Sequence, residues 1–296
     1  MTKKAQSLFL IFMIYLFAMT MGVLTYLTLN IESMIGSILI ANIVTTFIVF
    51  IFGLGLKNAS LYDPYWSVIP PFITIGLSIL WGRFFDLEVL LLNLAILIWA
   101  IRLTYNWAKL WTDFSHQDWR YEMIKEKTHK LWPIANFLAI HLFPTLIVFV
   151  QLIGAIIYIE YVQNITWLSF LGFVLIIFAT YIQFKSDQQM QIFKKEHPKK
   201  VMNKGLWQYS RHPNYFGEVT VWIGVYLFYL SVGMTLNILI FAPLAMLMLF
   251  VFISIPMMEK RQIKSKPEYV EYISDVSMLV PLPFKFTHLF KKPETS

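Results

Sequence analysis

The chain has 296 residues, of which 58% are hydrophobic and only 14% are charged; its formal net charge is +7 and its mean hydropathy is +0.62. Such a chain cannot cover itself with a polar surface, which excludes a soluble globular protein and predicts an integral membrane protein with no nucleic-acid partner. The absence of cysteine excludes disulfides, cysteine-ligated zinc and thiol nucleophiles. The six histidines never stand four residues apart, so a helical His-x-x-x-His site is also excluded, and no metal is expected.

Apolar runs that are long enough to cross a bilayer, or nearly so, follow one another along the chain, and they predict about eight spanning helices. The first run begins behind Lys3 and Lys4 without a small-residue cleavage pattern, which predicts a retained helix and not a removed signal peptide. The third and seventh runs are short, so seven or nine helices with a re-entrant segment are the alternatives. The runs cover residues 8–29, 35–56, 67–81, 87–108, 134–158, 166–184, 218–232 and 235–256.

The basic residues fall almost entirely on one side of this predicted arrangement. With the N-terminus inside, the inner segments carry 22 of the 24 Lys and Arg residues. The other two are Arg83, in an outer loop, and Arg102, inside the fourth run. This asymmetry supports an even number of helices and predicts that both termini are cytoplasmic.

Polar residues gather at the inner end of the fourth run and in the loop behind it. Arg102, Asn106 and Lys109 have helical spacing and share one face. A cation inside an apolar run usually faces a polar cavity or a partner, so Arg102 is a candidate catalytic residue; alternatively, its side chain snorkels to the inner headgroups. The segment at 111–122 is rich in polar and aromatic residues, among them Tyr121, and is either part of a site or a solvated amphipathic helix.

The sixth run leaves the membrane through Gln183, Asp187 and Gln191, which are four residues apart, and a Lys-rich segment follows at 194–200. Asp187 is the only acid on that face. It can accept a hydrogen bond from a ribose hydroxyl or an amide, or it can simply pair with Lys185 or Gln191. The basic segment is typical of a solvated or lipid-attracted face, although positive charge at a cavity mouth would also concentrate anionic cofactors.

The segment at 203–218, N-K-G-L-W-Q-Y-S-R-H-P-N-Y-F-G-E, packs polar and aromatic groups between two apolar runs. His212 precedes a proline and is biased away from helix, whereas Pro213 suits the first position of a helix. A helix that begins near Pro213 would turn free N–H groups and its positive dipole end toward Arg211, which adds a planar donor fork. The pattern predicts a phosphate or carboxylate site; the alternative is a juxtamembrane loop whose arginine meets lipid headgroups.

The C-terminal region begins with a charged segment that includes Glu259 and Arg261. Tyr269 and Tyr272 then have helical spacing, which predicts a short amphipathic helix on the inner face. No G-x-G-x-x-G, G-x-x-x-x-G-K-[ST] or G-x-S-x-G motif occurs in a suitable context. Any nucleotide would therefore be held by the membrane helices and the inner loops themselves.

Several of these stretches together resemble the steroid 5-alpha-reductase superfamily, and most closely its bacterial membrane branch. The resemblance covers most of the chain after about residue 60, which suggests N-terminal membrane helices at 1–60, a reductase-like membrane domain at 61–285 and a disordered tail at 286–296. The stretches are G-L-W-Q-Y-S-R-H-P-N-Y-F-G-E at 205–218, S-D-Q-Q-M-Q-I-F-K at 186–194, Y-V-E-Y-I-S-D-V-S-M-L-V-P at 269–281, D-P-Y-W at 63–66, R-L-T-Y-N-W at 102–107 and D-W-R-Y at 118–121.

The resemblance implies a polytopic membrane enzyme of a bacterial inner (plasma) membrane, with a cofactor cavity on the cytoplasmic side. It implies hydride transfer from NADPH to a carbon–carbon double bond conjugated with a carbonyl, in a steroid-like or other lipidic enone from the bilayer. Glu218 would complete the nicotinamide site and is a candidate catalytic residue. The candidate cofactor-binding residues are Asp187, Arg211, His212, Asn214, Tyr215, Glu218, Arg261 and Tyr269.

The chain departs from the steroid enzymes at one position. Those enzymes polarise the substrate carbonyl with a Glu and a Tyr on earlier helices, but the second apolar run contains no Glu. Tyr121, Tyr105 or Asp63 would supply the acid instead. A tyrosine or an arginine such as Arg102 would stabilise the enolate oxygen.

Two other classes of protein compete with a reductase. The R-H-P-x-Y stretch also resembles isoprenylcysteine carboxyl methyltransferases and related membrane enzymes that bind S-adenosylmethionine, although these carry a paired Glu-Glu where this chain has only Glu259 after Met258. A transporter or lipid-binding protein would place helix breakers at mid-membrane. The prolines at 70, 71 and 144 are the weak signs of that class, which ranks last because the polar groups gather at the inner mouth.

Overall fold

The computed structural model describes residues 2–235 and 237–283, so the predicted tail at 286–296 lies outside the described part of the chain. All regular elements in the described ranges are helices, which confirms the all-α fold class. The chain forms two compact units, one over residues 1–160 and one that begins at Tyr161. The domain boundary expected near residue 60 falls inside the first unit.

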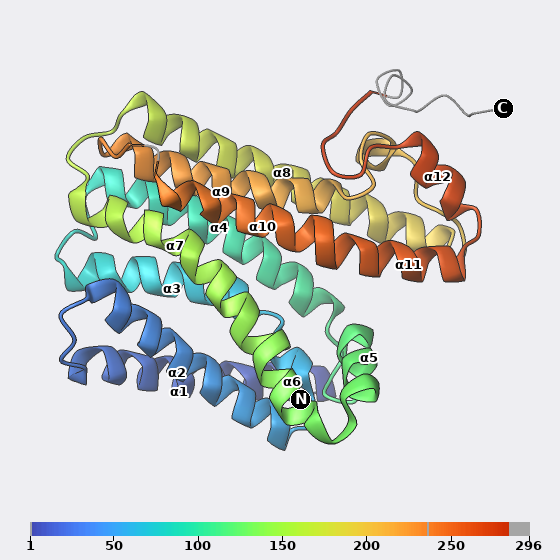
Figure 1. Ribbon diagram of the computed structural model, residues 1–296, viewed down its shortest axis with the longest axis horizontal. Helices are drawn as coiled ribbons and strands as arrows, with labels where there is room; N and C mark the ends of the chain where they lie inside the picture. The colour runs from blue at the N-terminus through green and yellow to red at the C-terminus, as the bar shows by residue number, and fades with distance from the viewer. Residues whose placement is uncertain (1, 236, 284–296) are drawn as a thin grey trace. The chain divides into compact units, whose positions relative to one another are not determined.

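Short 3-10 and π-helical segments lie between some of the α-helices of each unit, and Figure 1 labels the α-helices. The first unit contains α1 (Lys3–Thr28), α2 (Met34–Gly55), η1 (Ala59–Tyr62), α3 (Tyr65–Leu80), α4 (Leu87–Leu110), α5 (Trp119–Thr128), η2 (His129–Leu131), α6 (Trp132–Ala135), η3 (Asn136–Leu142) and α7 (Phe143–Tyr161). The second contains α8 (Trp167–Glu196), η4 (Gly205–Gln208), α9 (Pro213–Ser231), η5 (Ile238–Ile240), α10 (Phe241–Leu249), η6 (Phe250–Ser254), α11 (Ile255–Ser265) and α12 (Tyr269–Asp275).

Six helical stretches in the described residues are long and apolar enough to cross a membrane, and the protein is therefore a multi-pass membrane protein. Two of them combine consecutive short elements, α5 to α7 and η5 to α11, and in the first the chain turns at His129, whose φ is 45°. The stretches are Lys3–Thr28, Met34–Gly55, Leu87–Leu110, Trp119–Tyr161, Trp167–Glu196 and Ile238–Ser265.

The two short runs that were counted as spans also form helices, but neither is among the six. α3 has 16 residues and is about 24 Å long at 1.5 Å per residue, which is less than the thickness of the hydrocarbon core. α9 has 19 residues, but its first turns contain Asn214 and Glu218, which lower its hydropathy. The sequence predicted about eight spanning helices and the structure has six membrane-crossing stretches in its described residues; α3 and α9 account for the difference.

In the second unit, α8 and α9 lie side by side with their backbones in contact (Figure 1). A Cβ atom on Gly224 would lie 2.8 Å from the carbonyl oxygen of Gly172, and one on Gly217 would lie 2.9 Å from that of Ala179. Small residues permit such close helix packing in membranes, where dispersion forces replace the hydrophobic effect. The glycine of the N-Y-F-G-E stretch therefore has a packing role, and it brings Glu218 beside α8.

Replacing Gly224 with valine is expected to destabilise the second unit by about 2 kcal/mol or more, because overpacking would force two backbones apart. The readout is the melting temperature of the protein purified in detergent. Gly55→Val is the matched control, since a Cβ on Gly55 meets no atom within 4 Å. Equal melting temperatures for the two variants would contradict the close packing of α8 on α9.

Candidate functional site

The polar segment at 203–218 folds into a short 3-10 helix, a turn and the start of α9. Gly205 has a φ of 63°, a left-handed conformation that suits glycine, and its neighbour Leu206 donates its backbone N–H to Gln189 Oε1 at 2.9 Å. α9 begins at Pro213 with His212 at its N-cap, as the sequence predicts, and no side chain caps it. Pro213 has no N–H, the N–H of Tyr215 donates to Asn214 Oδ1 at 3.1 Å, and that of Phe216 donates to His212 O at 3.0 Å.

Glu218 lies one turn inside α9 and is only 3% exposed. Gln183 on α8 donates its side-chain amide to Glu218 Oε2 at 2.6 Å, and the indole of Trp222 donates to Oε1 at 3.0 Å. The side-chain oxygen of Gln183 is buried and has no hydrogen-bond partner. The amide oxygen of Gln183 is therefore a buried unmet acceptor, which is costly, and it stands beside a carboxylate whose two oxygens each already accept a hydrogen bond.

Arg211 and His212 share one carboxylate, that of Glu259 on α11. Arg211 Nε lies 2.8 Å from Glu259 Oε1, and His212 Nε2 lies 3.0 Å from the same oxygen. All three side chains are largely buried, which makes this a low-dielectric ion pair. The imidazole of His212 also stacks on Tyr215, which stacks on Phe250 with 4.4 Å between the ring centroids.

The C-terminal segment is fastened onto the same turn. Arg211 donates its backbone N–H to Ser277 O at 2.8 Å and its Nη1 to Ile273 O at 2.6 Å. Ser210 donates its hydroxyl to Leu279 O at 2.7 Å, and Tyr272 donates to Trp207 O. Arg211, which was predicted to contact a phosphate, is therefore largely engaged by the protein itself and joins α11 and the chain after α12 to the start of α9.

α12 confirms the predicted C-terminal helix, and it buries Tyr269 and Tyr272 at helical spacing. Burial raises the pKa of Tyr269 well above its ordinary value, and the nearby Glu259 carboxylate raises it further. Burial likewise raises the pKa of Tyr272. Both phenols are therefore neutral and can serve only as hydrogen-bond donors and acceptors near neutral pH.

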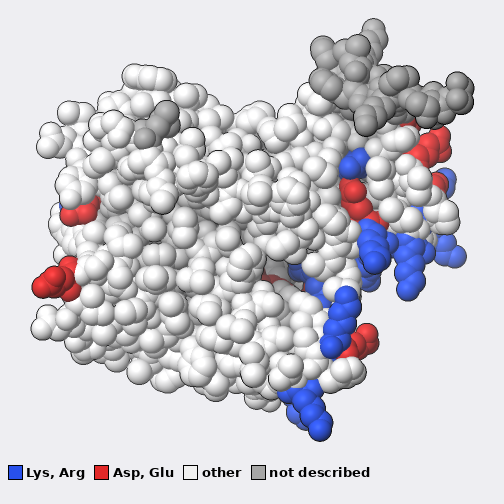
Figure 2. Space-filling model, viewed as in Figure 1, with Lys and Arg blue, Asp and Glu red and all other residues white. Residues whose placement is uncertain are grey.

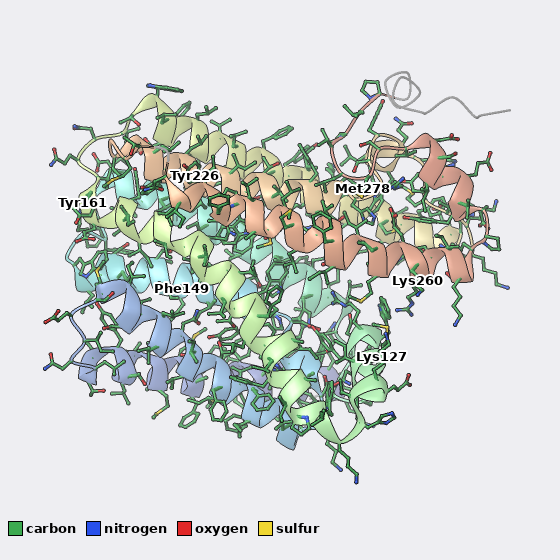
Figure 3. All side chains as sticks on the ribbon, viewed as in Figure 1. Lys127, Phe149, Tyr161, Tyr226, Lys260 and Met278 are labelled. Carbon is green, nitrogen blue, oxygen red and sulfur yellow. The ribbon has the colours of Figure 1, made fainter. Side chains whose placement is uncertain are left out.

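A cavity of about 540 Å³ opens beside α12, a size typical of ligand pockets. It is lined by residues from the end of α8, the loop before η4 and α12. Its charged lining is mixed, and consists of Lys200, Lys204, Glu268, Glu271 and Asp275. Exposed basic residues of α11, among them Lys260 and Arg261, gather around the same end of the unit (Figures 2 and 3).

The remaining predicted cofactor contacts lie at different depths in the second unit. Asn214 is half-buried, and its side-chain oxygen accepts from the N–H of Tyr215 at 3.1 Å. Asp187 is half-buried on α8, one turn beyond Gln183. Arg261 is exposed on α11. The second unit thus contains all the candidate cofactor residues, and it brings Arg211, His212 and Tyr269 together around Glu259.

The other catalytic candidates belong to the first unit. Tyr121 donates its hydroxyl to Asp63 Oδ1, so two of the proposed acids form one pair, whereas Tyr105 is 63% exposed. Arg120 bonds Asp118 at 2.8 Å beside this pair. Arg102 is half-buried on α4.

The polar segment at 111–122 is neither a continuous amphipathic helix nor an open loop. Asn58 donates its side-chain amide to Phe114 O and His116 O, both at 2.9 Å, and the Asp118 N–H donates to Ser60 Oγ at 2.9 Å. Asp118 then caps α5 by accepting from Arg120 N at 2.8 Å. The side chains of Asn58 and Ser60 therefore hold the backbone of this segment against η1.

Asp63 has an unusual titration behaviour. Burial raises its pKa from the ordinary 3.8 to about 6, although the Tyr121 hydrogen bond and the Arg120 charge oppose the rise. The folded state thus favours the protonated carboxyl, so its stabilising contribution is complete below about pH 4 and is lost as the pH rises through about 6.

Replacing Asp63 with asparagine should remove this dependence, because the amide is neutral throughout and its oxygen can still accept from Tyr121. The variant is expected to gain up to about 3 kcal/mol over the native chain at pH 7, with the gain vanishing at pH 4. Melting temperatures in detergent across this range provide the measurement. A difference that does not vary with pH would contradict the raised pKa.

Three residues of the site were missed or undervalued in the sequence. Gln183 was read only as part of a polar helix face, and Trp222 was not singled out. Glu259 was noted only for lacking a second glutamate beside it. A clear signal existed for Gln183 alone, since an amide inside an apolar run needs a partner.

Comparisons with known proteins give a family but no activity. The model of the family described as a protein of unknown function, DUF1295, matches residues 49–276. An uncharacterized protein of the fission yeast Schizosaccharomyces pombe is 23% identical, over 76% of this chain and 73% of the yeast protein. No solved structure matches the chain significantly.

Proposed function

We propose that this chain, which belongs to the DUF1295 family, is a membrane-embedded NADPH-dependent reductase of a conjugated double bond in a steroid-like or other lipidic enone. The observation that carries the proposal is the pair of buried acceptors formed by Glu218 and Gln183 Oε1. A nicotinamide carries a carboxamide with two N–H donors. Two adjacent acceptors are the complement of such a group.

Other groups of the second unit have the chemistry to hold the rest of a dinucleotide. The start of α9 offers the positive end of a helix dipole, which favours a phosphate. The cavity beside α12 adds Lys200 and Lys204 for phosphates, while its carboxylates can accept from ribose hydroxyls. Asp187, on the same face of α8 as Gln183, would accept from a further hydroxyl.

When bound, NADPH would supply a hydride to the electron-poor carbon of the enone. Glu218 and Gln183 would hold the carboxamide and so fix which face of the ring meets the substrate. The electron pair displaced from the double bond moves to the carbonyl oxygen, and the neighbouring carbon takes a proton from a tyrosine or a water. The sequence-predicted catalytic residues Tyr121 and Arg102 belong to the first unit, and their roles stay predictions.

The proposal includes a membrane topology. We place both termini and the site's basic residues on the cytoplasmic side of a bacterial inner membrane, with α3 and α9 completing about eight crossings. NADPH would then arrive from the cytoplasm and an apolar substrate from the bilayer. A lipidic compound is thus the expected partner, together with the membrane lipids.

Hydride transfer can be tested directly with NADPH deuterated at the transferable position. The detergent-purified protein is incubated with this cofactor and a set of lipidic enones, and products are analysed by mass spectrometry and NMR. We expect one deuterium at the carbon β to the carbonyl. Saturated product without deuterium, or no saturated product from any enone although NADPH binds, would contradict the reductase assignment.

Methyl transfer from S-adenosylmethionine is the second candidate, and the acidic lining of the cavity favours it. Glu268, Glu271 and Asp275 line the pocket, and S-adenosylmethionine carries a sulfonium cation. In addition, Glu259 contacts both Arg211 and His212 of the R-H-P stretch. The deuterium experiment separates the candidates, because a methyltransferase would leave the double bond unreduced.

A further inference from the structure

The first unit contains an apolar groove that the proposed reductase site does not use. The groove has a volume of about 280 Å³ and lies between α1, α2 and α3. Its rim is exposed: Leu27 is 59%, Ile79 61% and Leu80 53% accessible. α1 and α2 are among the six membrane-crossing stretches, so bilayer lipid surrounds this rim.

One polar side chain interrupts the apolar wall. Asn42 lines the groove and is only 3% exposed. Its side-chain oxygen is already taken, because Tyr65 donates its hydroxyl to Asn42 Oδ1 at 2.8 Å. Its amide nitrogen is buried and has no hydrogen-bond partner. The unsatisfied group of Asn42 is therefore its N–H₂ donor.

The chemistry of a matching ligand follows from these two facts. An apolar groove that opens to lipid selects a molecule that is dissolved in the bilayer. An unpaired buried N–H₂ group needs an acceptor, such as a carbonyl oxygen. We propose that this groove binds a bilayer-resident compound whose apolar body fills the groove and whose carbonyl oxygen accepts a hydrogen bond from Asn42 Nδ2. This proposal does not rest on the reductase assignment.

Gly76 provides a way to close the groove without disturbing the fold. It lines the groove on α3, and a Cβ at this position meets no atom within 4 Å. A Gly76→Leu variant would therefore place its side chain in the space that the ligand needs. Gly55→Leu is the matched control, since Gly55 is exposed on α2, meets no atom within 4 Å and does not line the groove.

The experiment uses a long-chain methyl ketone that carries a photoreactive diazirine at its far end, and the alkane with the same diazirine. Each is added to the full-length protein in lipid nanodiscs without NADPH, and labelled residues are mapped by mass spectrometry. In the native chain we expect the ketone to label α1 to α3 about fivefold more than the alkane. This is the ratio of affinities that one hydrogen bond of typical strength produces. Gly76→Leu should abolish the labelling, and Gly55→Leu should retain it.

Asn42→Leu should reduce ketone labelling to the level of the alkane. If this variant does not fold, the ketone-to-alkane ratio in the native chain and the Gly76→Leu result decide the question. Equal labelling by the two probes in the native chain, or ketone labelling that survives Gly76→Leu, would overturn the proposal. Because the readout needs neither NADPH nor turnover, its failure is distinct from failure of the reductase assignment.

Discussion

Replacing Glu259 with alanine is expected to destabilise the second unit by about 3 kcal/mol, because it leaves a buried arginine without its counter-ion. Glu259 accepts from His212 and pairs with Arg211, and Arg211 in turn bonds the carbonyl of Ile273. Loss of the carboxylate should therefore also loosen the segment after α12. Thermal unfolding in detergent and limited proteolysis of the C-terminal segment are the measurements.

Two further variants define the origin of this effect. Glu259→Gln keeps an acceptor but removes the charge, so its melting temperature should lie between those of Glu259→Ala and the native chain. Lys260→Ala is the neighbouring control, since Lys260 is exposed on the same helix (Figure 3). The ion pair would have no structural role if Glu259→Ala and Lys260→Ala unfolded at the same temperature.

Replacing Glu218 with glutamine should weaken NADPH binding about tenfold or more, because a hydrogen bond to a charged acceptor is worth about 1.5–3 kcal/mol. The variant keeps an oxygen that can accept from Trp222, which preserves much of the packing around this position. Titration of NADPH fluorescence with the purified protein measures the change in affinity.

The matched control for this experiment is Asp63→Asn, which removes a carboxylate from the first unit and leaves the second unchanged. Its NADPH affinity should equal that of the native chain. If Glu218→Gln bound NADPH as tightly as the native chain and Asp63→Asn, the Glu218 carboxylate would not contact the cofactor.

The sequence predicted the helices well where the pattern was local. Pro213 after His212 marked the start of α9, and the spacing of Tyr269 and Tyr272 marked α12. Long apolar runs likewise predicted the spanning helices. α3 and α9 were also predicted as spans but are not among the six membrane-crossing stretches. α3 has only 16 residues, and α9 carries two polar residues in its first turns, so each is marginal for crossing a bilayer.

The contacts of the site could not be predicted in the same way, because they join residues far apart in the chain. Glu259 meets Arg211 only when α11 returns to the start of α9, and no local pattern records this. Gln183 meets Glu218 because glycines allow α8 and α9 to touch. Conversely, the polar segment at 111–122 looked like part of a site because Asn58, which anchors it, lies more than fifty residues away.

The most direct test of the reductase assignment is cofactor binding to the native protein. NADPH and S-adenosylmethionine are each added to the detergent-purified chain, and the melting temperature is recorded with Glu218→Ala and Asp187→Ala as controls. A ligand that binds only the folded state raises the melting temperature in proportion to its occupancy. We predict stabilisation by NADPH that both variants lose; stabilisation by S-adenosylmethionine alone would contradict the account.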